Sequence, residues 1–563
     1  MPSPVTFPTA DAEIVAAEAA LWANGYDAAR LADYQAAHRR LEARIAAAGN
    51  DRRHKFVVFV PVADRPQQLA ACLDSLLALC RAYGYGGMRD GRWTKVEAVI
   101  AEDSLGAGPI ANDRTLAEQF TGLGLVTHHF GPDEQAALLA SLDAAERAAL
   151  APVLGDTTPA YRGHKGQGVM RNLAHLYLSR WQRSEPEERL LFWSVDSDQE
   201  FAVKVATPNG DVEAVAIGYF HRFDEIFERS DALLLTGKVV GDPPVSPAVM
   251  TGNFLADLLG FLAEAAEGDP RSVCRHHDRE SHREGEAAYH DMAERFGFHQ
   301  TDAAYRYPCP LTGWHTEAQC FAHFAGRLNG FFYGEHPTRV SRYVHDDLWR
   351  TLQPARTVYA GNYVARPEAL AHVIPFAPLR LRMSGPTLGR LLKAQLGPRF
   401  VSANLPMLHK RTMAGSTQSE FRPGVAEVDT RVDLNGEFER QFFGDVMLFA
   451  MERLTAAGYP ARRPAKADFS ATLDDLRDDL LADYNARRTD IVANLDKLNE
   501  MLDDPNAWWS TMAHQSALAA FRNFADNIAR NFAEDATWVA RVNSPQYWQV
   551  KRAELATALE RHA

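Results

Sequence analysis

The stretch Leu190-Leu191-Phe192-Trp193-Ser194-Val195-Asp196-Ser197-Asp198 joins a mostly apolar run to two carboxylates one residue apart. An apolar run of this length predicts a strand buried on both faces, as in the interior of a parallel sheet. Ligands of open α/β sheets bind at the carboxyl ends of the strands. Asp196 and Asp198 are therefore expected at the ligand-binding edge of a sheet.

Similar apolar runs occur upstream, at residues 56–61, 96–101 and 125–130. Segments with apolar residues at helical spacing, residues 65–83 and 169–181, lie between the predicted strands. Strands that alternate with helices indicate βαβ units. The sequence therefore predicts an α/β fold with a mainly parallel sheet flanked by helices.

The two ends of the chain have a helical pattern without strands. Residues 10–50 are rich in Ala, Leu, Glu and Arg at helical spacing and predict an N-terminal helical cap, and residues from about 436 onward predict a C-terminal helical layer. We therefore predict an N-terminal helical segment (1–53), an α/β domain (54–415) with an insertion at 255–345, and a C-terminal helical domain (416–563).

Composition limits the classes of partner. Of the 563 residues, 60 are Lys or Arg and 73 are Asp or Glu, which gives a net charge of −13. An acidic chain is a poor match for a phosphate backbone, so no nucleic-acid partner is expected. We see no run of about 18 apolar residues without charges, so no transmembrane segment is expected either.

The cysteines predict a reducing environment. They form no CxxC pair, and buried thiols in a cytoplasmic protein are the expected state. The stretch Cys274-Arg275-His276-His277-Asp278-Arg279-Glu280-Ser281-His282 holds metal-capable residues but lacks zinc spacing, so it predicts a solvated loop. The five cysteines are Cys72, Cys80, Cys274, Cys309 and Cys320.

Two motifs carry the expected chemistry. Asp196 and Asp198 offer oxygen ligands of the kind that Mg²⁺ or Mn²⁺ takes. The stretch Gly163-His164-Lys165-Gly166-Gln167-Gly168 places glycines around a lysine directly before a helix, which favours a phosphate group there, although the P-loop spacing is missing.

Taken together, these motifs resemble those of GT-A glycosyltransferases. The similarity rests on a first strand ending at Pro61 before a polar residue, the acidic turn Glu102-Asp103-Ser104, the Lys165-Gly166 loop, and Asp196-Ser197-Asp198.

A later segment resembles the retaining glucosyl-3-phosphoglycerate synthase and mannosylglycerate synthase group. Ala360-Gly361-Asn362-Tyr363-Val364-Ala365-Arg366-Pro367-Glu368-Ala369-Leu370 and Ile374-Pro375-Phe376-Ala377-Pro378 look like segments of that group, in which a helix, a strand and a histidine follow. Their counterparts here are residues 387–395, a strand at 400–408, and His409. The resemblance covers roughly residues 55–415.

The resemblance implies a GT-A, Rossmann-like domain that moves a hexose from a UDP- or GDP-sugar to a small-molecule or glycan acceptor. It implies that Mn²⁺ or Mg²⁺ binds Asp198 and His409, and that Asp196 lies beside the ribose or the metal. It also implies that Pro61, Asp64 and the Glu102-Asp103 turn contact the nucleoside and Lys165 the diphosphate. Asp196, Asp198 and Lys165 are then the catalytic candidates.

The loop Arg380-Leu381-Arg382-Met383-Ser384-Gly385-Pro386 departs from the family pattern because it contains no carboxylate. Its lack of a base favours retention, in which the leaving diphosphate oxygen accepts the proton of the acceptor. Arg380, Arg382 and Asn362 are expected near the acceptor.

Three alternatives remain open from the sequence. An inverting glycosyltransferase would use Asp346 or Asp347 as its base, a sugar-phosphate nucleotidyltransferase would share the sheet and the paired acids, and a non-catalytic scaffold would only bind sugar nucleotides. A homo-oligomer is compatible with any of these.

Overall fold

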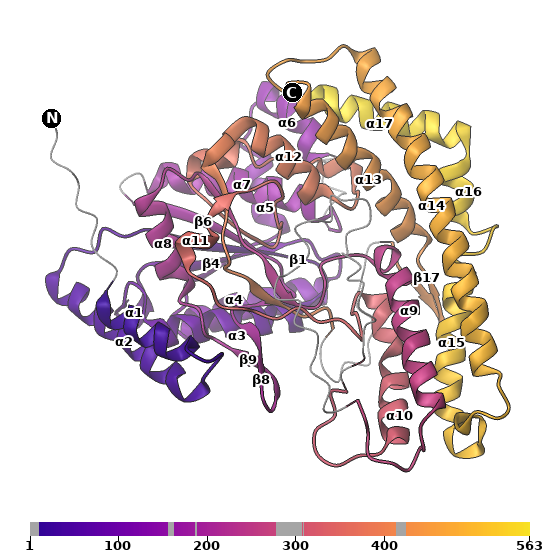
Figure 1. The fold of residues 1–563 in the computed structure, drawn as a ribbon. Helices are drawn as coiled ribbons and strands as arrows, with labels where there is room; N and C mark the ends of the chain where they lie inside the picture. The colour runs from indigo at the N-terminus through magenta and orange to yellow at the C-terminus, as the bar shows by residue number, and fades with distance from the viewer. Residues whose placement is uncertain are drawn as a thin grey trace.

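Figure 1 shows a computed structural model of the chain, in which a twisted sheet lies between the N-terminal helices and a layer of long C-terminal helices. The structure describes residues 11–155, 163–185, 188–276, 307, 309–412 and 424–562.

The central sheet has eight strands in the order β12-β14-β10-β13-β6-β1-β4-β5. Strands β6, β1, β4 and β5 pair in parallel, as do β10 and β14, whereas β13 and β12 are antiparallel to their neighbours. The prediction of a mixed α/β fold with a mostly parallel sheet is confirmed. The strands are β1 (Lys55–Val62), β4 (Val96–Glu102), β5 (Thr127–Phe130), β6 (Leu190–Val195), β10 (Leu234–Thr236), β12 (Gln353–Pro354), β13 (Asn362–Ala365) and β14 (Phe400–Ser402).

Strand β1 is apolar from Phe56 to Val62, and helices cover both faces of the sheet there. Phe56, Val58 and Val60 belong to one core, while Val57 and Phe59 point into the other. The first core contains residues of α3 and α8, and the second contains residues of α7 and α12. The helices beside the sheet are α3 (Pro66–Tyr83), α4 (Ala107–Gly122), α7 (Gln167–Ser184), α8 (Tyr219–Arg229) and α12 (Ser384–Leu396).

The strand predicted at residues 400–408 is wrong in one respect, because it is broken in two. Strand β14 ends at Ser402, a tight turn follows in which the N–H of Leu405 donates to the carbonyl of Ala403 (2.8 Å), and Pro406 has no N–H for a continuous ladder. The chain resumes as β15 (Met407–His409) in a second sheet with β11 (Val239–Gly241) and β7 (Gln199–Glu200).

The C-terminal layer includes helices from the region predicted as an insertion. Helices α9 (Pro247–Ala266) and α10 (Glu317–Arg327) lie beside α14 (Lys466–Leu502) and α15 (Gln515–Asn531) (Figure 1). Among the described residues, α9 is the one helix long and apolar enough to cross a membrane, but 56% of its most apolar window is buried inside the protein. Packing against the other helices accounts for this apolarity.

The remaining elements include the buried helix α13, which packs on α12 and α14, and several short elements. They are α5 (Pro132–Ala140), α6 (Ala144–Leu154), α11 (Leu348–Thr351), α13 (Asn435–Ala456), α16 (Thr537–Asn543), α17 (Pro545–His562), β2 (Met88–Arg89), β3 (Arg92–Trp93), β8 (Val203–Thr207), β9 (Gly210–Ala214), β16 (Ala426–Val428) and β17 (Arg431–Asp433).

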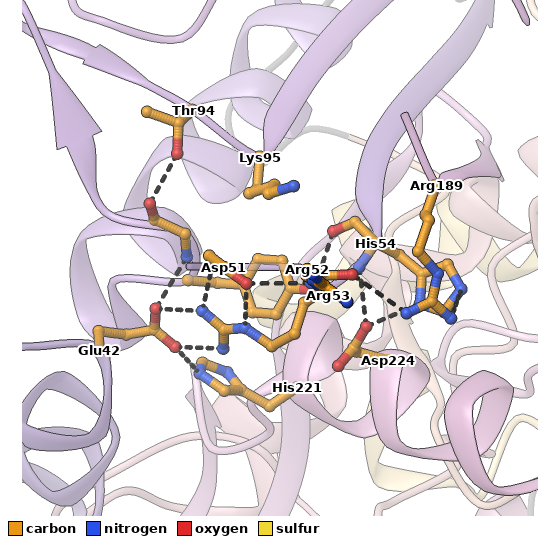
Figure 2. Close-up of polar contacts among 12 residues, drawn as sticks. Glu42, Asp51, Arg52, Arg53, His54, Thr94, Lys95, Arg189, His221 and Asp224 are labelled. Atoms are coloured by element: carbon orange, nitrogen blue, oxygen red, sulfur yellow. Dashed lines mark hydrogen bonds and ion pairs between the residues drawn. The ribbon is translucent and has the colours of Figure 1, made fainter. Parts of the chain in front are cut away.

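A buried polar network fixes the N-terminal helices α1 (Ala12–Trp22) and α2 (Ala28–Ala48) to the sheet. Figure 2 shows Glu42 of α2 accepting two hydrogen bonds from Arg53, each of 2.7 Å, and facing His221 of α8 at 2.7 Å. Burial opposes the charge on Glu42, but the hydrogen bonds from Arg53 and His221 hold its pKa below the usual value. The network joins α2, the residues before β1, and α8.

We expect Arg53→Met to lower the melting temperature, because it leaves the Glu42 carboxylate buried without its bidentate partner. Loss of one member of a buried ion pair costs about 3 kcal/mol. Arg52→Met is the matched control, since Arg52 is exposed and precedes the network. Equal melting temperatures of the two variants in a calorimetric scan would show that the network contributes no stability.

Candidate active site

Asp198 and His409, which lie more than 200 positions apart in the sequence, face each other at the edge of the sheet. Asp198 follows β6, and His409 ends β15, which pairs with β7 so that His409 lies opposite Gln199. The N–H of Lys410 donates to the carbonyl of Asp198 (2.9 Å). His409 Nε2 is 3.6 Å from Asp198 Oδ1, and both side chains are buried. The structure therefore brings together the two predicted metal ligands.

The hydrogen bonding of His409 defines which nitrogen faces Asp198. Its Nδ1 lies 2.8 Å from the carbonyl oxygen of Asp242, which can only accept, so Nδ1 carries a proton. In the neutral imidazole, the lone pair of Nε2 then faces the carboxylate, and a cation between the two acceptors satisfies both. Metal-binding histidines commonly donate their other N–H in this way.

The spacing fits an oxygen- and nitrogen-bound divalent ion. Adjacent ligands of a six-coordinate Mg²⁺, each about 2.1 Å away, lie about 3 Å apart, so a small approach of the two side chains from 3.6 Å would fit such an ion. Two protein ligands leave the remaining positions for substrate oxygens and water, as is usual for Mg²⁺ bound with phosphates.

A glycine allows the close approach of β11 to β15. Gly241 has φ +89°, and a Cβ there would lie 2.6 Å from the carbonyl oxygen of His409. The next residue, Asp242, donates its N–H to that same carbonyl (2.9 Å) and accepts the N–H of Arg411 on its carboxylate (2.8 Å). Gly241 and Asp242 together fix the position of His409.

Two arginines complete the surroundings of Asp198. Its Oδ2 lies 3.4 Å from Arg65 Nη1 and 3.7 Å from Arg411 Nη1. Burial opposes ionisation of Asp198, but His409 when its ring is protonated, together with Arg411 and Arg65, outweighs burial and holds the pKa of Asp198 well below the usual value. Two guanidinium groups therefore lie beside the Asp198 carboxylate, and the Asp242 carboxylate also acts on Arg411.

Sequence reasoning missed Arg65. Arg65 follows the end of β1, which is the direct neighbour of β6, so its position after a parallel strand was the available signal. Arg411 is directed to Asp198, whereas the ammonium of Lys410 lies 2.9 Å from Glu200 and 2.7 Å from Glu213. Only the first of the two basic residues after β15 contacts the acidic residues of β7 and β9.

Asp196 is separated from the Asp198–His409 pair. Its carboxylate forms an ion pair with Arg171 of α7, and a Cβ at Gly361 would lie 2.6 Å from its Oδ2. Among the described residues, Asp196 does not converge with Asp198 and His409 into a three-ligand group. The structure therefore does not join Asp196 to the Asp198–His409 pair, its partly buried carboxylate contacts α7, and its predicted place beside the ribose stays a prediction.

The Lys165 loop is held by a carboxylate of the protein itself. Asp103 Oδ1 accepts the N–H of Lys165 and its Oδ2 accepts the N–H of Gly166, both at 2.8 Å, at the start of α7. Lys165 is almost buried, and its Nζ lies 3.8 Å from Asp103 Oδ1; burial lowers the pKa of Lys165. Because Asp103 occupies these donors, the predicted diphosphate role of Lys165 is not supported by the geometry.

Of the other residues predicted to contact the nucleoside, two are buried and one is partly exposed. Pro61 is buried within β1, and Glu102 is fully buried with its carboxylate accepting the N–H of Ser104 (2.7 Å). Both lie beneath the surface. Asp64, with φ +54°, is instead partly exposed, and its carboxylate pairs with the partly exposed His164.

Glu102 belongs to a buried acidic pair that the sequence did not indicate. Burial and the neighbouring Glu102 raise the pKa of Asp113 on α4 to about 9, so Asp113 stays protonated near neutral pH. His129 of β5 lies 3.5 Å from Glu102. The buried Glu102–Asp113 pair lies beneath the turn that follows β4.

The predicted acceptor residues lie in different environments. Asn362 is fully buried, and its amide oxygen accepts from Trp193 (3.1 Å) while its nitrogen donates to the carbonyls of Lys238 (2.8 Å) and Leu405 (3.0 Å). All its hydrogen-bonding groups are used inside the protein, so its predicted contact with an acceptor is wrong.

Arg380 is exposed, while Arg382 is tied to a carboxylate from α13. Glu437 is buried, forms an ion pair with Arg382, and lies 3.5 Å from Arg440. Arg382 is close enough to Arg411 to contribute to lowering its pKa, although burial is the largest cause. The loop at 380–386 therefore adds positive charge on the side of Arg411.

The sequence matches no known family model and no curated protein. Among solved structures, the chain is similar to the mannosyltransferase PcManGT from Pyrobaculum calidifontis in complex with GDP-mannose and Mn²⁺. The two are 9% identical, the TM-score is 0.31, and the alignment covers 93% of this chain and 99% of the mannosyltransferase. A TM-score this low does not establish a shared fold.

Proposed function

We propose that the chain is a metal-dependent glycosyltransferase that moves a hexose from a nucleoside diphosphate, UDP or GDP, to a small-molecule or glycan acceptor. The observation that carries the proposal is the Asp198–His409 pair, with the His409 imidazole oriented by Asp242 and two arginines behind the carboxylate. This arrangement suits a divalent cation that itself binds an anionic substrate.

Each residue has a defined part in this proposal. Asp198 and His409 hold Mn²⁺ or Mg²⁺, which when bound neutralises charge on the departing diphosphate. Arg65 and Arg411 supply fixed donors for diphosphate oxygens, in place of Lys165. The partly exposed Asp64 and His164 would contact the nucleoside, which would be partly exposed to solvent.

Retention of the anomeric configuration is the outcome that we propose. Asp347 caps α11 by accepting the N–H of Arg350 (2.9 Å), and Asp346 pairs with Arg350 (2.6 Å), so both candidate bases have other partners. Glu437, which pairs with Arg382 of the 380–386 loop, is held by Arg382 and Arg440. We therefore propose that a leaving diphosphate oxygen accepts the proton, as in the retaining GT-A group that the sequence resembles.

The proposal is tested with UDP- and GDP-sugars and Mn²⁺. We expect a donor to raise the melting temperature of the protein more with Mn²⁺ than without it, and slow hydrolysis to release the nucleoside diphosphate. Release of pyrophosphate from a nucleoside triphosphate and a sugar phosphate would instead identify a nucleotidyltransferase. Stabilisation without any turnover, across a panel of acceptors, would identify a binding scaffold.

We expect His409→Ala to raise the metal concentration for half-maximal activity about 10- to 100-fold and to lower the maximal rate, because one ligand is lost. His372→Ala is the matched control, since His372 ends a 3-10 turn outside the site. The measurement is a Mn²⁺ titration of donor hydrolysis. If His409→Ala changed only the melting temperature and left the Mn²⁺ dependence as in the wild type, His409 would be a structural histidine.

The compartment proposed for this activity is the cytoplasm. All five cysteines are free thiols, as expected where disulfides are rare. In the cytoplasm, the proposed donor substrates of the enzyme are UDP- and GDP-sugars.

A further inference from the structure

Three cysteines, one of them distant in the sequence from the other two, form one buried cluster in the C-terminal layer. The sulfur atoms of Cys274, Cys309 and Cys320 all lie within 4.8 Å of one another, and no disulfide joins them. Their side chains are at most 9% exposed. The cluster lies after α9 and at the start of α10, among different elements from those that hold Asp198 and His409.

A histidine is directed to the same cluster. His315 Nε2 is 3.2 Å from Cys309 Sγ, while its Nδ1 lies 2.9 Å from the carbonyl oxygen of Gly313, which can only accept. Nδ1 therefore carries the proton, and the lone pair of Nε2 faces the sulfur in the neutral ring. A carbonyl that fixes the tautomer in this way is typical of metal-bound histidine.

The backbone holds these residues in place without any disulfide. The N–H of Cys274 donates to the carbonyl of His315 (3.0 Å), and Val273 forms an antiparallel bridge with Thr316. Thr316 caps α10, whose first turn carries Cys320. The N–H of Cys309 donates to the carbonyl of His276 (3.1 Å). Each of the four ligand candidates thus lies on or beside a hydrogen-bonded segment.

We infer that Cys274, Cys309, His315 and Cys320 bind one structural Zn²⁺ ion. With Zn–S distances of about 2.3 Å, two thiolates of a tetrahedral site lie about 3.8 Å apart, within the 4.8 Å limit that the three sulfurs meet. Three thiolates and one imidazole form a closed Cys₃His set, which suits zinc and leaves no position for a substrate. The structure confirms the expected buried thiols, and the proposal adds a ligand role for three of them.

The spacing of the four residues in the sequence does not match a zinc motif. Cys309, His315 and Cys320 are close in the chain, but Cys274 lies 35 positions before Cys309, so no zinc motif is visible. The neighbouring His276 is not one of the ligands, because its ring nitrogens lie 3.5 Å from Glu264 and 3.6 Å from Glu317. The residues from His277 to His282 that the sequence singled out lie outside the described residues.

The proposed site would fix α10 against the C-terminal helices. Phe321, which follows Cys320, stacks on Trp509 and contacts Phe521 of α15. An ion that joins the start of α10 to the residues after α9 therefore holds the aromatic contacts between these helices. Its expected role is stability of this layer.

The test measures zinc in the full-length protein, purified under reducing conditions without added metal and passed through EDTA and gel filtration. We expect about one zinc ion per chain by mass spectrometry, and almost none in Cys309→Ser or Cys320→Ser. Cys80→Ser is the matched control, because Cys80 is a buried free thiol on α3 outside the cluster. Protein produced with Co²⁺ should show the visible bands of a tetrahedral site and thiolate charge-transfer absorption, weakened in His315→Ala.

The wild-type measurement decides the inference even if the cysteine variants fail to fold. A wild-type protein with far less than one zinc per chain and five titratable thiols would overturn it, and so would a disulfide between two of the three cysteines. Asp198→Asn should retain the zinc, so loss of transferase activity and loss of the zinc site are distinguishable. Zinc that disappears in Asp198→Asn but persists in Cys309→Ser would place the ion at the other site and refute the inference.

Discussion

Asp198→Asn is expected to lower the rate of glycosyl transfer and of donor hydrolysis about a thousandfold. The substitution keeps the size of the side chain but removes the charge that faces His409 and the two arginines. Removing a group that stabilises transition-state charge through a metal costs about two to three orders of magnitude. The measurement is the rate of nucleoside diphosphate release at saturating Mn²⁺.

Asp74→Asn is the control for this substitution, because Asp74 is an exposed carboxylate on α3. Circular dichroism of both variants should match the wild type. An Asp198→Asn protein with near-wild-type turnover would contradict the assignment of Asp198, whatever its melting temperature.

Arg411→Met should weaken donor binding about 30- to 100-fold, with a smaller effect on binding of metal alone. A charge-assisted contact between a nearly buried guanidinium and a phosphate contributes about 2–3 kcal/mol. Calorimetric titration with GDP or UDP in the presence of Mn²⁺ measures the loss. Lys410→Met is the neighbouring control, since its ammonium contacts Glu200 and Glu213 and not Asp198.

Donor affinity that falls equally in both variants would show that general charge, and not the position of Arg411, determines binding. Unchanged affinity in Arg411→Met would exclude Arg411 from the diphosphate site. In that case the Lys165 loop would again be the candidate, although Asp103 would have to release its amides.

The fold was predictable where the sequence pattern has a single physical interpretation. The apolar runs at β1, β4 and β6 are buried on both faces, so their residues alternate between two cores and show no polar face. Asp198 followed from its place at the end of β6. His409 was implied by the family resemblance, and the continuous strand predicted to lead to it is interrupted before Pro406. The pairing of β7 with β15 brings His409 to Asp198.

The unpredicted features depend on contacts between distant residues. Glu437 and the Asp113–Glu102 pair have no local pattern that separates them from ordinary surface or core residues. Asn362 was assigned to the acceptor because of its motif, but only the structure shows that Trp193 and two carbonyls use its amide. The cysteine cluster likewise depends on how α9 and α10 are joined.

The position of a bound metal tests the account most directly. Crystals grown with Mn²⁺ and UDP or GDP should show an anomalous diffraction peak between Asp198 Oδ1 and His409 Nε2, with the diphosphate beside Arg411. A manganese peak at another position, or a nucleotide bound at full occupancy with no metal contact to Asp198 or His409, would contradict the proposed centre.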